Sequence, residues 1–298
     1  MKIHSKLGLV TWNIGFANCS PERFINNKKI GRIQWLKHSY KDRFFADPFI
    51  LSVSSTEIKV LVEELEFITN KGRITLLIVD PVTKVLLSRK PLLELSTHLS
   101  YPAILTYNDH TYVYPENSEA GTLSMYEYNF ENDTLSYVAR ISDECLVDAT
   151  IFRKKQKYYM FATKLPHSQE DAFLYHSSVL FGNYQKHMHI SSGKQHSRSA
   201  GDLLELGDKL YRPTQNCCKR YGANVELMEV LRLDDSYEEK HMFTLKTTSL
   251  RYNLGLHTIN FQDSLCVIDG KGYLYPIIGR LYNYARFLYY KLKEFKIA

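Results

Sequence analysis

Acidic side chains recur along this chain directly beside short apolar segments. Asp47 precedes Pro48 in ADPFI, Asp148 lies in VDATIF, and Glu116 lies in PEN. Several carboxyl groups gathered at one place suit glycosyl transfer, in which a protonated carboxyl donates to the leaving oxygen and an ionised one acts as base or nucleophile. Crowding of like charges is one way to separate the pKa values of such groups. The alternative is that Asp47 and Asp148 cap turns, where aspartate is common.

This chemistry requires residues far apart in the sequence to meet, and a repeat in the chain gives a reason why they should. A segment of polar or small residues followed by an apolar run recurs about every 50 residues. A second strand-like run follows each segment after a short polar turn, and most units continue with a further alternating run. The five leading segments are residues 46–52, 100–107, 147–153, 199–206 and 255–262.

A period of about 50 residues with three or four short strands is typical of a β-propeller blade. Helical repeats fit poorly, because Tyr, Val, Ile and Phe alternate with a period of two. The sequence therefore predicts an all-β, five-bladed β-propeller over residues 1–279, with a short C-terminal amphipathic helix over residues 280–298. The early segment LGLVTWNIGFA is expected to complete the last blade and close the ring.

In a propeller the innermost strands line a central channel, so equivalent positions of different repeats meet at one mouth of that channel. Such a mouth is a concave site. We expect Asp47 to act there as base or nucleophile, Glu116 as acid, and Asp148 to orient or tune them. The second strand of blade one offers Glu63 or Glu64 for the mouth, and we predict that Glu64 binds the substrate. The predicted substrate-binding residues are Glu64, His98, Lys164, Arg198, Arg212, Gln215 and His257, the last of which is as readily a structural histidine.

Seven short motifs carry a resemblance to a known family. They are ADPFI (46–50), EEL (63–65), HLSYP (98–102), PEN (115–117), VDATIF (147–152), RSAG (198–201) and YRPTQNC (211–217). In this order they resemble the N-terminal domain of glucosamine inositolphosphorylceramide transferase and its stand-alone bacterial relatives. The resemblance implies a five-bladed propeller, distantly like the arabinanase and xylosidase propellers with their three catalytic carboxylates. It also implies a role in surface-polysaccharide or glycolipid biosynthesis.

The chain departs from the arabinanase-like pattern on two blades. Asp47 matches the aspartate of their DP motif, but residues 100–102 carry no carboxylate on blade two, and blade three offers Asp148 in place of glutamate. Glu116 is expected to supply the missing acid from the neighbouring strand. The resemblance therefore implies a glycosyltransferase-like or glycosidase-like activity on a sugar or glycan, either lipid-linked or nucleotide-activated. The alternative is a non-catalytic propeller that binds a glycan or serves as a scaffold for a partner glycosyltransferase.

Composition and motifs exclude several other classes of protein. The 298 residues include 38 Lys and Arg against 32 Asp and Glu, and 44% are hydrophobic, which is ordinary for a globular protein. No nucleic-acid motif accompanies the net charge of +6, so we predict no nucleic-acid partner. Without a P-loop or GxGxxG fingerprint we predict no cofactor. Five cysteines without CxxC spacing and no convincing signal peptide favour a cytoplasmic protein.

Two further features have both a functional and a plain interpretation. His187, His189 and His196 invite a metal site, but no cysteine or carboxylate adjoins them to complete a ligand set, so we predict no metal. The tail, residues 280–298, carries an apolar stripe flanked by basic residues, which suits peripheral contact with an anionic membrane at its inner face. The alternative is that this helix packs on the propeller as a cap. The stripe consists of Leu281, Tyr284, Leu288, Leu292 and Phe295.

Overall fold

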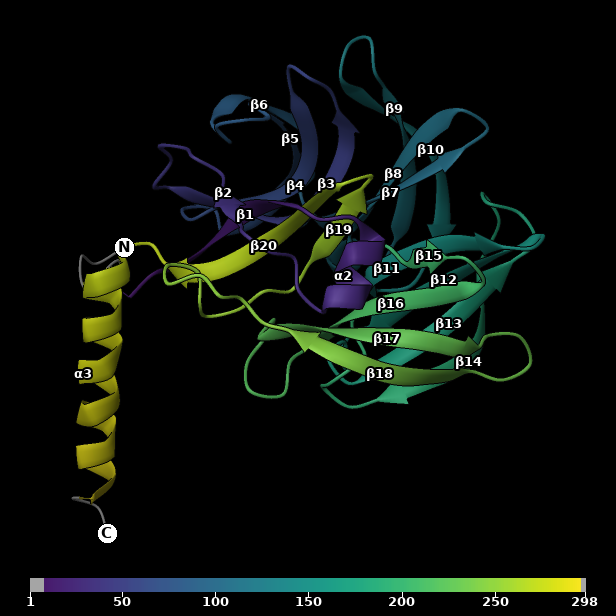
Figure 1. Ribbon diagram of the computed structural model, residues 1–298. Helices are drawn as coiled ribbons and strands as arrows, with labels where there is room; N and C mark the ends of the chain where they lie inside the picture. The colour runs from purple at the N-terminus through teal and green to yellow at the C-terminus, as the bar shows by residue number, and fades with distance from the viewer. Residues whose placement is uncertain (1–7, 296–298) are drawn as a thin grey trace.

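The computed structural model describes the backbone of residues 8–295, with side chains described for residues 8–190 and 193–289. Within this range the strands form five four-stranded antiparallel sheets, arranged as blades around one axis (Figure 1). The predicted fold class, an all-β five-bladed β-propeller with a C-terminal helix, is confirmed.

Four of the blades are continuous in the sequence, and in each the first strand is the innermost one. Blade one comprises β3 (Arg43–Val53), β4 (Ile58–Glu66), β5 (Lys71–Val79) and β6 (Leu86–Leu93). Blade two comprises β7 (Ser100–Tyr107), β8 (His110–Glu116), the short helix η1 (Ser118–Ala120), β9 (Leu123–Asn129) and β10 (Thr134–Ser142). Blade three comprises β11 (Leu146–Lys154), β12 (Lys157–Lys164), β13 (Asp171–Ser177) and β14 (Gln185–Ser192). Blade four comprises β15 (Leu204–Leu206), β16 (Lys209–Asn216), β17 (Asn224–Arg232) and β18 (Glu238–Leu245).

The fifth blade joins the two ends of the chain and closes the ring. Its strand order is β19 (Ile259–Gln262), β20 (Leu265–Tyr273), β1 (Val10–Asn18) and β2 (Gln34–Trp35). All nine residues of β1 pair with β20, from Val10 opposite Tyr273 to Asn18 opposite Leu265. The prediction that the first strand completes the last blade is therefore confirmed. Between β1 and β2 the short helix α2 (Pro21–Asn27) buries Phe24 against blade four, where its ring lies 5.2 Å from that of Phe243.

Alternation of apolar and polar residues along the strands places an apolar cluster between each pair of neighbouring blades. Phe16 and Phe45, for example, belong to the cluster shared by blades five and one. Tyr101 and Met160 belong to the cluster between blades two and three. Because each blade is packed on both sides, the inner strands are held with equivalent positions facing the channel.

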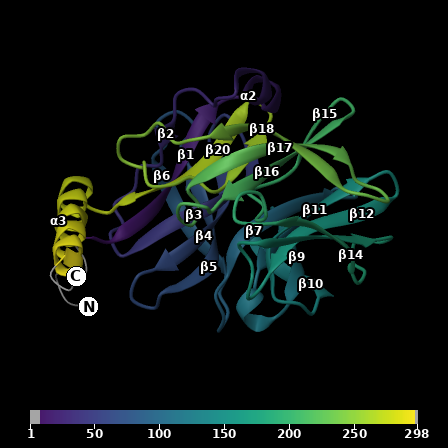
Figure 2. The same ribbon diagram turned by 90° about the horizontal axis from the view of Figure 1, so that it is seen from below.

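The C-terminal helix α3 (Pro276–Phe295) stands beside the propeller and follows directly from β20 (Figures 1 and 2). It begins at Pro276 rather than at the predicted residue 280. Its first turns are fastened to the propeller, since the Arg280 guanidinium donates to the carbonyl of Leu250 and to Asn253. Of its predicted stripe, Leu281 and Tyr284 are exposed, whereas the side chains of Leu292 and Phe295 lie outside the described residues. No helix in residues 8–295 is long and apolar enough to cross a membrane.

Candidate functional site

Three inner strands bend in the same way where they reach the mouth of the channel. A bulge interrupts the pairing between Ala46 and Phe49 in β3, and the corresponding breaks occur in β7 and β11. The bulged residues Asp47, Tyr101 and Asp148 all have left-handed backbones, with φ of 48°, 44° and 49°. Aspartate tolerates this conformation better than most residues. The bulges leave three backbone amides without a strand partner, and acidic side chains satisfy them.

Asp47 is held by groups from two other blades. Its Oδ2 accepts from the Tyr101 amide at 3.2 Å, and its Oδ1 accepts from the Thr258 hydroxyl at 2.7 Å. The side chain is buried, with 5% of the residue exposed. Burial raises the pKa of Asp47 to about 7; the positive charge of His257 opposes this rise, and the neighbouring carboxylates Glu63 and Asp269 add to it.

His257 lies between two carboxylates of the same cluster. Its Nδ1 is 2.5 Å from Asp269 Oδ2 and 3.6 Å from Asp47 Oδ1, and its ring stacks on Trp12 with the centroids 4.0 Å apart. Burial would lower the pKa of His257, but Asp269 and Asp47 outweigh burial and raise it to about 9. The imidazole is therefore charged at neutral pH. Asp269 also accepts from the backbone amides of His257, Thr258 and Asp47, so it is a structural anchor of the mouth.

Glu116 and Asp148 form the other half of the cluster. Glu116 Oε2 accepts from the Asp148 amide at 3.1 Å and Oε1 accepts from the Ser118 hydroxyl at 2.8 Å. Burial, followed by the negative charge of Asp148, raises the pKa of Glu116 to about 8, so its carboxyl is mostly protonated at neutral pH. Asp148 Oδ2 accepts from Arg198 Nε at 2.6 Å and from Gln215 Nε2 at 2.7 Å. We call Asp47, Glu116, Asp148, His257 and Asp269 the channel-mouth cluster.

His98 lies beside this cluster and is more open to solvent. Its Nδ1 accepts from the Gly72 amide at 3.1 Å, so Nε2 carries the proton and faces Glu63 Oε1 at 3.2 Å. The His98 side chain is 36% exposed, whereas Asp47, Glu116 and Asp148 are each less than one-tenth exposed. Of the predicted residues, the structure thus brings together Asp47, Glu116, Asp148, His98, Arg198, Gln215 and His257.

Glu64 does not face the channel, which corrects the sequence-based choice between Glu63 and Glu64. Neighbouring residues of a strand point to opposite faces, and Glu63 is the one that lies near His98 and Asp47. Glu64 is fully buried in a cluster of three arginines, and Thr75 donates to it at 2.8 Å. Despite burial, these partners keep the pKa of Glu64 lowered. The arginines are Arg43, Arg73 and Arg89.

Arg212 and Lys164 also have partners away from the cluster. Arg212 makes a two-pronged ion pair with Glu239, through Nε at 3.0 Å and Nη2 at 2.7 Å, and is buried. It alternates with Gln215 along β16, which is why only Gln215 reaches Asp148. Lys164 pairs with Glu144 at 2.6 Å, and its side chain is 43% exposed. These two predicted binding residues are therefore engaged in other ion pairs.

Sequence reasoning missed Asp269 as a member of the mouth and chose Glu64 over Glu63. Asp269 and Glu63 both lie on second strands of their blades, as Glu116 and Gln215 do. The signal for Asp269 was present in the repeat, because VIDGK follows the fifth leading segment. For Glu63 the missing information was the register of β4 against β3, where Glu63 pairs with Ala46.

Possible metal-ligand atoms of Asp47, His257 and Asp269 lie within 4.8 Å of one another, a spacing at which three residues could share one metal ion. The residues fit an ion poorly, because a His ligand must be neutral whereas the raised pKa of His257 keeps its proton between the two carboxylates. Each oxygen of Asp47 and Asp269 already accepts a hydrogen bond. Among the described residues no other group of three such ligands lies this close together. His187, His189 and His196, which invite a metal site in the sequence, form no such group. The five cysteines are free thiols.

Comparisons with known proteins agree with this architecture. The family model described as "Glucosamine inositolphosphorylceramide transferase 1, N-terminal" matches residues 19–253. The protein of that name from Arabidopsis thaliana is 27% identical over 242 residues, covering 75% of this chain and 30% of the relative. The one from Oryza sativa subsp. japonica is 25% identical over 156 residues, covering 49% and 21%. The chain thus spans less than a third of the length of these relatives.

Solved structures with similar folds include two carbohydrate-active enzymes. An α-L-arabinofuranosidase from Podospora anserina, in complex with cellotriose, has a TM-score of 0.56 and 9% identity, covering 75% of this chain and 78% of its own. A GH43 β-1,3-galactosidase with galactodeoxynojirimycin has a TM-score of 0.53 and 9% identity, covering 70% and 79%. At this identity the likeness establishes the propeller fold.

Proposed function

Because this chain belongs to the family of the N-terminal domain of glucosamine inositolphosphorylceramide transferase 1, we propose that it is a carbohydrate-active propeller that takes part in glycosyl transfer during glycan or glycolipid assembly. One observation carries the proposal. Carboxylates from three successive blades, Asp47, Glu116 and Asp148, meet at one channel mouth beside the partly exposed His98. This is the arrangement that acid–base chemistry at a glycosidic oxygen needs.

In this proposal the two carboxyls have different tasks because their surroundings differ. Glu116, with its pKa raised to about 8, holds a proton at neutral pH and donates it to the leaving oxygen. Asp47, with a pKa near 7 and the positive charge of His257 beside it, supplies the ionised carboxylate as base or nucleophile. Asp148 positions Glu116 through its backbone amide, while Gln215 and Arg198 fix its carboxylate. Arg198 and His98 are the candidate partners of sugar hydroxyls.

The test is to replace each carboxyl by its amide and measure turnover with a panel of nucleotide sugars and aryl glycosides. Asp47→Asn and Glu116→Gln should each reduce turnover by about a thousandfold, the usual worth of a positioned acid or base. Asn also tolerates the left-handed backbone at position 47, so the melting temperature should change little. Asp80→Asn, at an exposed turn, serves as the matched control. Unfolding of Asp47→Asn would instead support a turn-capping role.

A second candidate is a non-catalytic propeller that binds a glycan for a partner transferase. Two observations favour it: the three carboxylates are less than one-tenth exposed, and both oxygens of Asp47 and Glu116 already hold hydrogen bonds. A thermal-shift screen separates the two candidates. Stabilisation by an activated donor that differs between wild type and Asp47→Asn supports transfer, whereas equal stabilisation of the two proteins by free sugars or oligosaccharides supports binding alone.

We also propose that α3 contacts an anionic membrane surface from the cytoplasmic side. Ile277 and Leu281 on its first turns are 76% and 65% exposed, and the helix stands clear of the blades (Figure 1). Ile277→Glu/Leu281→Glu should abolish cosedimentation with vesicles containing phosphatidylglycerol. Val82→Glu/Val179→Glu, at two exposed positions on the blades, should leave it unchanged. Unchanged sedimentation of the helix variant would refute membrane contact.

A further inference from the structure

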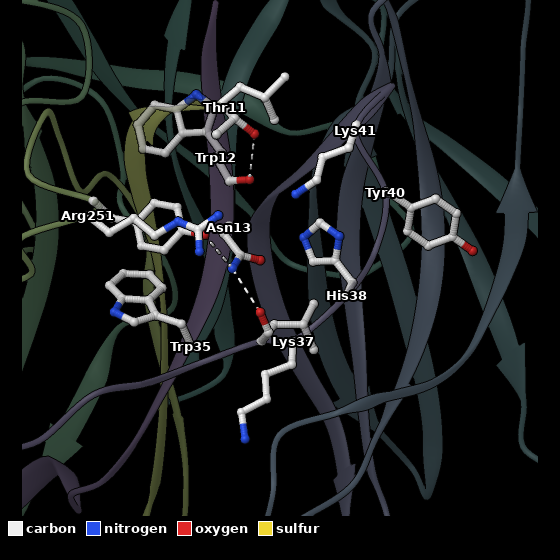
Figure 3. Close-up of a pocket in the computed structure, with 12 residues that line it drawn as sticks. Thr11, Trp12, Asn13, Trp35, Lys37, His38, Tyr40, Lys41 and Arg251 are labelled. Atoms are coloured by element: carbon white, nitrogen blue, oxygen red, sulfur yellow. Dashed lines mark hydrogen bonds between the residues drawn. The ribbon is translucent and has the colours of Figure 1, made fainter. Parts of the chain in front are cut away.

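A second cavity, separate from the channel mouth, opens where blade five meets the loop that leads into blade one. It has a volume of about 480 Å³, and its walls come from β1, β2, residues 36–41 and residues 251–252. Figure 3 shows the side chains of Asn13, His38, Lys41 and Arg251 directed toward its centre. We call it the cationic pocket. None of the residues of the channel-mouth cluster lines it.

Asn13 provides the floor of this pocket and has an unused acceptor. The residue is only 3% exposed, and its Nδ2 donates to the Leu36 carbonyl at 3.0 Å and to the Tyr252 hydroxyl at 2.9 Å. A carbonyl can only accept, so this bond fixes which end of the amide is nitrogen. No donor among the described residues reaches Asn13 Oδ1. A buried acceptor without a donor is costly, and a ligand hydroxyl placed here would satisfy it.

The charge of the pocket is positive. Lys37, Lys41 and Arg251 line it, and none of the described residues that line it is acidic. The nearby Asp42 is paired with Arg43. Burial, and then the charges of Lys41 and Arg251, lower the pKa of His38 to about 4, so these two cations lie close to the imidazole. Like charges facing one cavity without a counter-charge favour an anionic ligand.

Aromatic rings complete the walls. Trp35 and Tyr252 lie side by side, with ring centroids 4.3 Å apart. The Arg251 guanidinium lies over the Tyr252 ring, 5.3 Å from its centroid, which is a cation–π contact. Trp12 forms the wall shared with the channel mouth, since it lines the pocket and also stacks on His257. Flat apolar rings of this kind stack on the faces of sugars and bases.

We propose that the cationic pocket binds a phosphorylated sugar. Lys41 and Arg251 bind the phosphate, a ring hydroxyl donates to Asn13 Oδ1, and the ring lies against Trp35. The volume accommodates a ligand of this size. The inference does not depend on the proposed catalytic roles, because Asp47 and Glu116 contribute no atom to the pocket. The shared Trp12 would place the bound phosphate ester next to the channel mouth.

Such a phosphate ester can be soluble or attached to a lipid. A cleft of about 690 Å³ adjoins the pocket through Lys41 and Leu274. It is lined mainly by apolar and aromatic side chains, with Lys41 and Asp42 as its charged residues; the others are Leu9, Phe67, Ile68, Leu274 and Tyr275. A lipid chain leaving the phosphate would enter this cleft, whereas a soluble sugar phosphate would leave it empty. The experiment therefore needs both kinds of ligand.

The test is isothermal titration of the full chain with glucose 1-phosphate, UDP-glucose, inorganic phosphate and glucose. A parallel sedimentation arm uses phosphatidylcholine vesicles that carry phosphatidylinositol or, at equal surface charge, phosphatidylglycerol. Lys41→Ala/Arg251→Ala should weaken binding of the phosphorylated ring by about a hundredfold, about tenfold for each charged contact. Arg153→Ala/Lys240→Ala removes the same two charges elsewhere, and Arg153 also lies over a tyrosine ring, so it is the matched control.

Each outcome decides a part of the proposal. Binding of glucose 1-phosphate or UDP-glucose that is lost in the pocket variant and kept in the control, in Asp47→Asn and in Glu116→Gln supports a soluble ligand. Preference for phosphatidylinositol over phosphatidylglycerol vesicles, with the same dependence on Lys41 and Arg251, supports the lipid-borne form. Inorganic phosphate binding as tightly as glucose 1-phosphate would overturn the role of the ring. Equal weakening in both double variants, or no binding to any of these probes, would overturn the site.

Discussion

The channel-mouth cluster and the cationic pocket share a wall at Trp12, yet their polar groups differ in burial and in hydrogen bonding. In the cluster each carboxylate oxygen of Asp47 and Glu116 accepts a hydrogen bond from the protein, and the side chains are almost entirely buried. In the pocket Asn13 Oδ1 has no donor among the described residues, and Lys41 and Arg251 face the cavity from exposed positions.

The difference teaches which polar groups hold the fold and which are free to bind. A buried charge is costly unless protein groups hydrogen-bond to it or pair with it. The carboxylates of the cluster therefore use most of their hydrogen-bonding capacity within the protein, and this holds them in place. Exposed cations around a cavity cost little in stability and keep their binding capacity. The following predictions test this contrast, beginning with the largest expected effect.

Glu64→Ala should be the most destabilising of these changes. It leaves Arg43, Arg73 and Arg89 facing one another without their shared carboxylate, and breaking a buried ion pair costs about 3–5 kcal/mol. The neighbouring Glu63→Ala is the matched control, since among the described residues Glu63 has an ion pair with the partly exposed His98 alone, whereas Glu64 has three arginine partners, and it should cost less than Glu64→Ala. Urea unfolding measures both. Equal losses of unfolding free energy in the two variants would mean that Glu63 and Glu64 contribute equally to stability, which would contradict the prediction.

The stability of the protein should fall as pH rises from about 6.5 to 9. The pKa of His257 is raised to about 9 in the folded protein, so its contribution is full below its unfolded pKa of about 6.5 and is lost on the way to 9. Glu116, with its pKa raised to about 8, acts in the same direction, because the folded state holds a proton that the unfolded state has released.

Glu116→Gln sharpens this prediction, because an amide cannot ionise. The variant should lose less stability over the same pH range, by up to about 2 kcal/mol, when urea midpoints are compared at each pH. Glu131→Gln, at an exposed turn, should follow the wild-type profile. A wild-type profile that is flat above pH 6.5 would contradict the protonated carboxyl.

Lys41→Ala/Arg251→Ala should have the smallest effect on folding. Both side chains are exposed, and surface substitutions usually change the free energy of unfolding by less than about 0.5 kcal/mol. The same pH profile as wild type is expected between pH 6.5 and 9. A loss comparable with that of Glu64→Ala would show that the pocket cations are structural and would remove the contrast between the two regions.

The repeat could be found from the sequence because the same residue types recur at the same place in each blade. ADPFI and VDATIF mark the bulges of β3 and β11, where an aspartate tolerates the left-handed backbone, and PEN marks the end of β8. Equivalent positions must meet in a closed ring, so Asp47, Glu116 and Asp148 could be placed together from the sequence alone.

The direction of single side chains could not be found in that way. The choice between Glu63 and Glu64 depended on the register in which β4 pairs with the bulged strand β3, because a shift of one residue exchanges the two faces of a strand. Arg212 lies three residues before Gln215 in β16, so it points to the opposite face of the strand and pairs with Glu239. Lys164 forms an ion pair with Glu144, which precedes β11, and no sequence pattern indicated this pairing.

By itself the sequence determined the number of blades, the closing strand and three carboxylates of the mouth, Asp47, Glu116 and Asp148, since these follow from local patterns that repeat. The cationic pocket was decided only by the tertiary structure. Asn13 and Arg251 come from opposite ends of the chain and stand at no position that recurs in the other blades, and they meet because β1 pairs with β20 to close the ring. Contacts made by ring closure leave no periodic signal, so only the folded arrangement of the blades shows them.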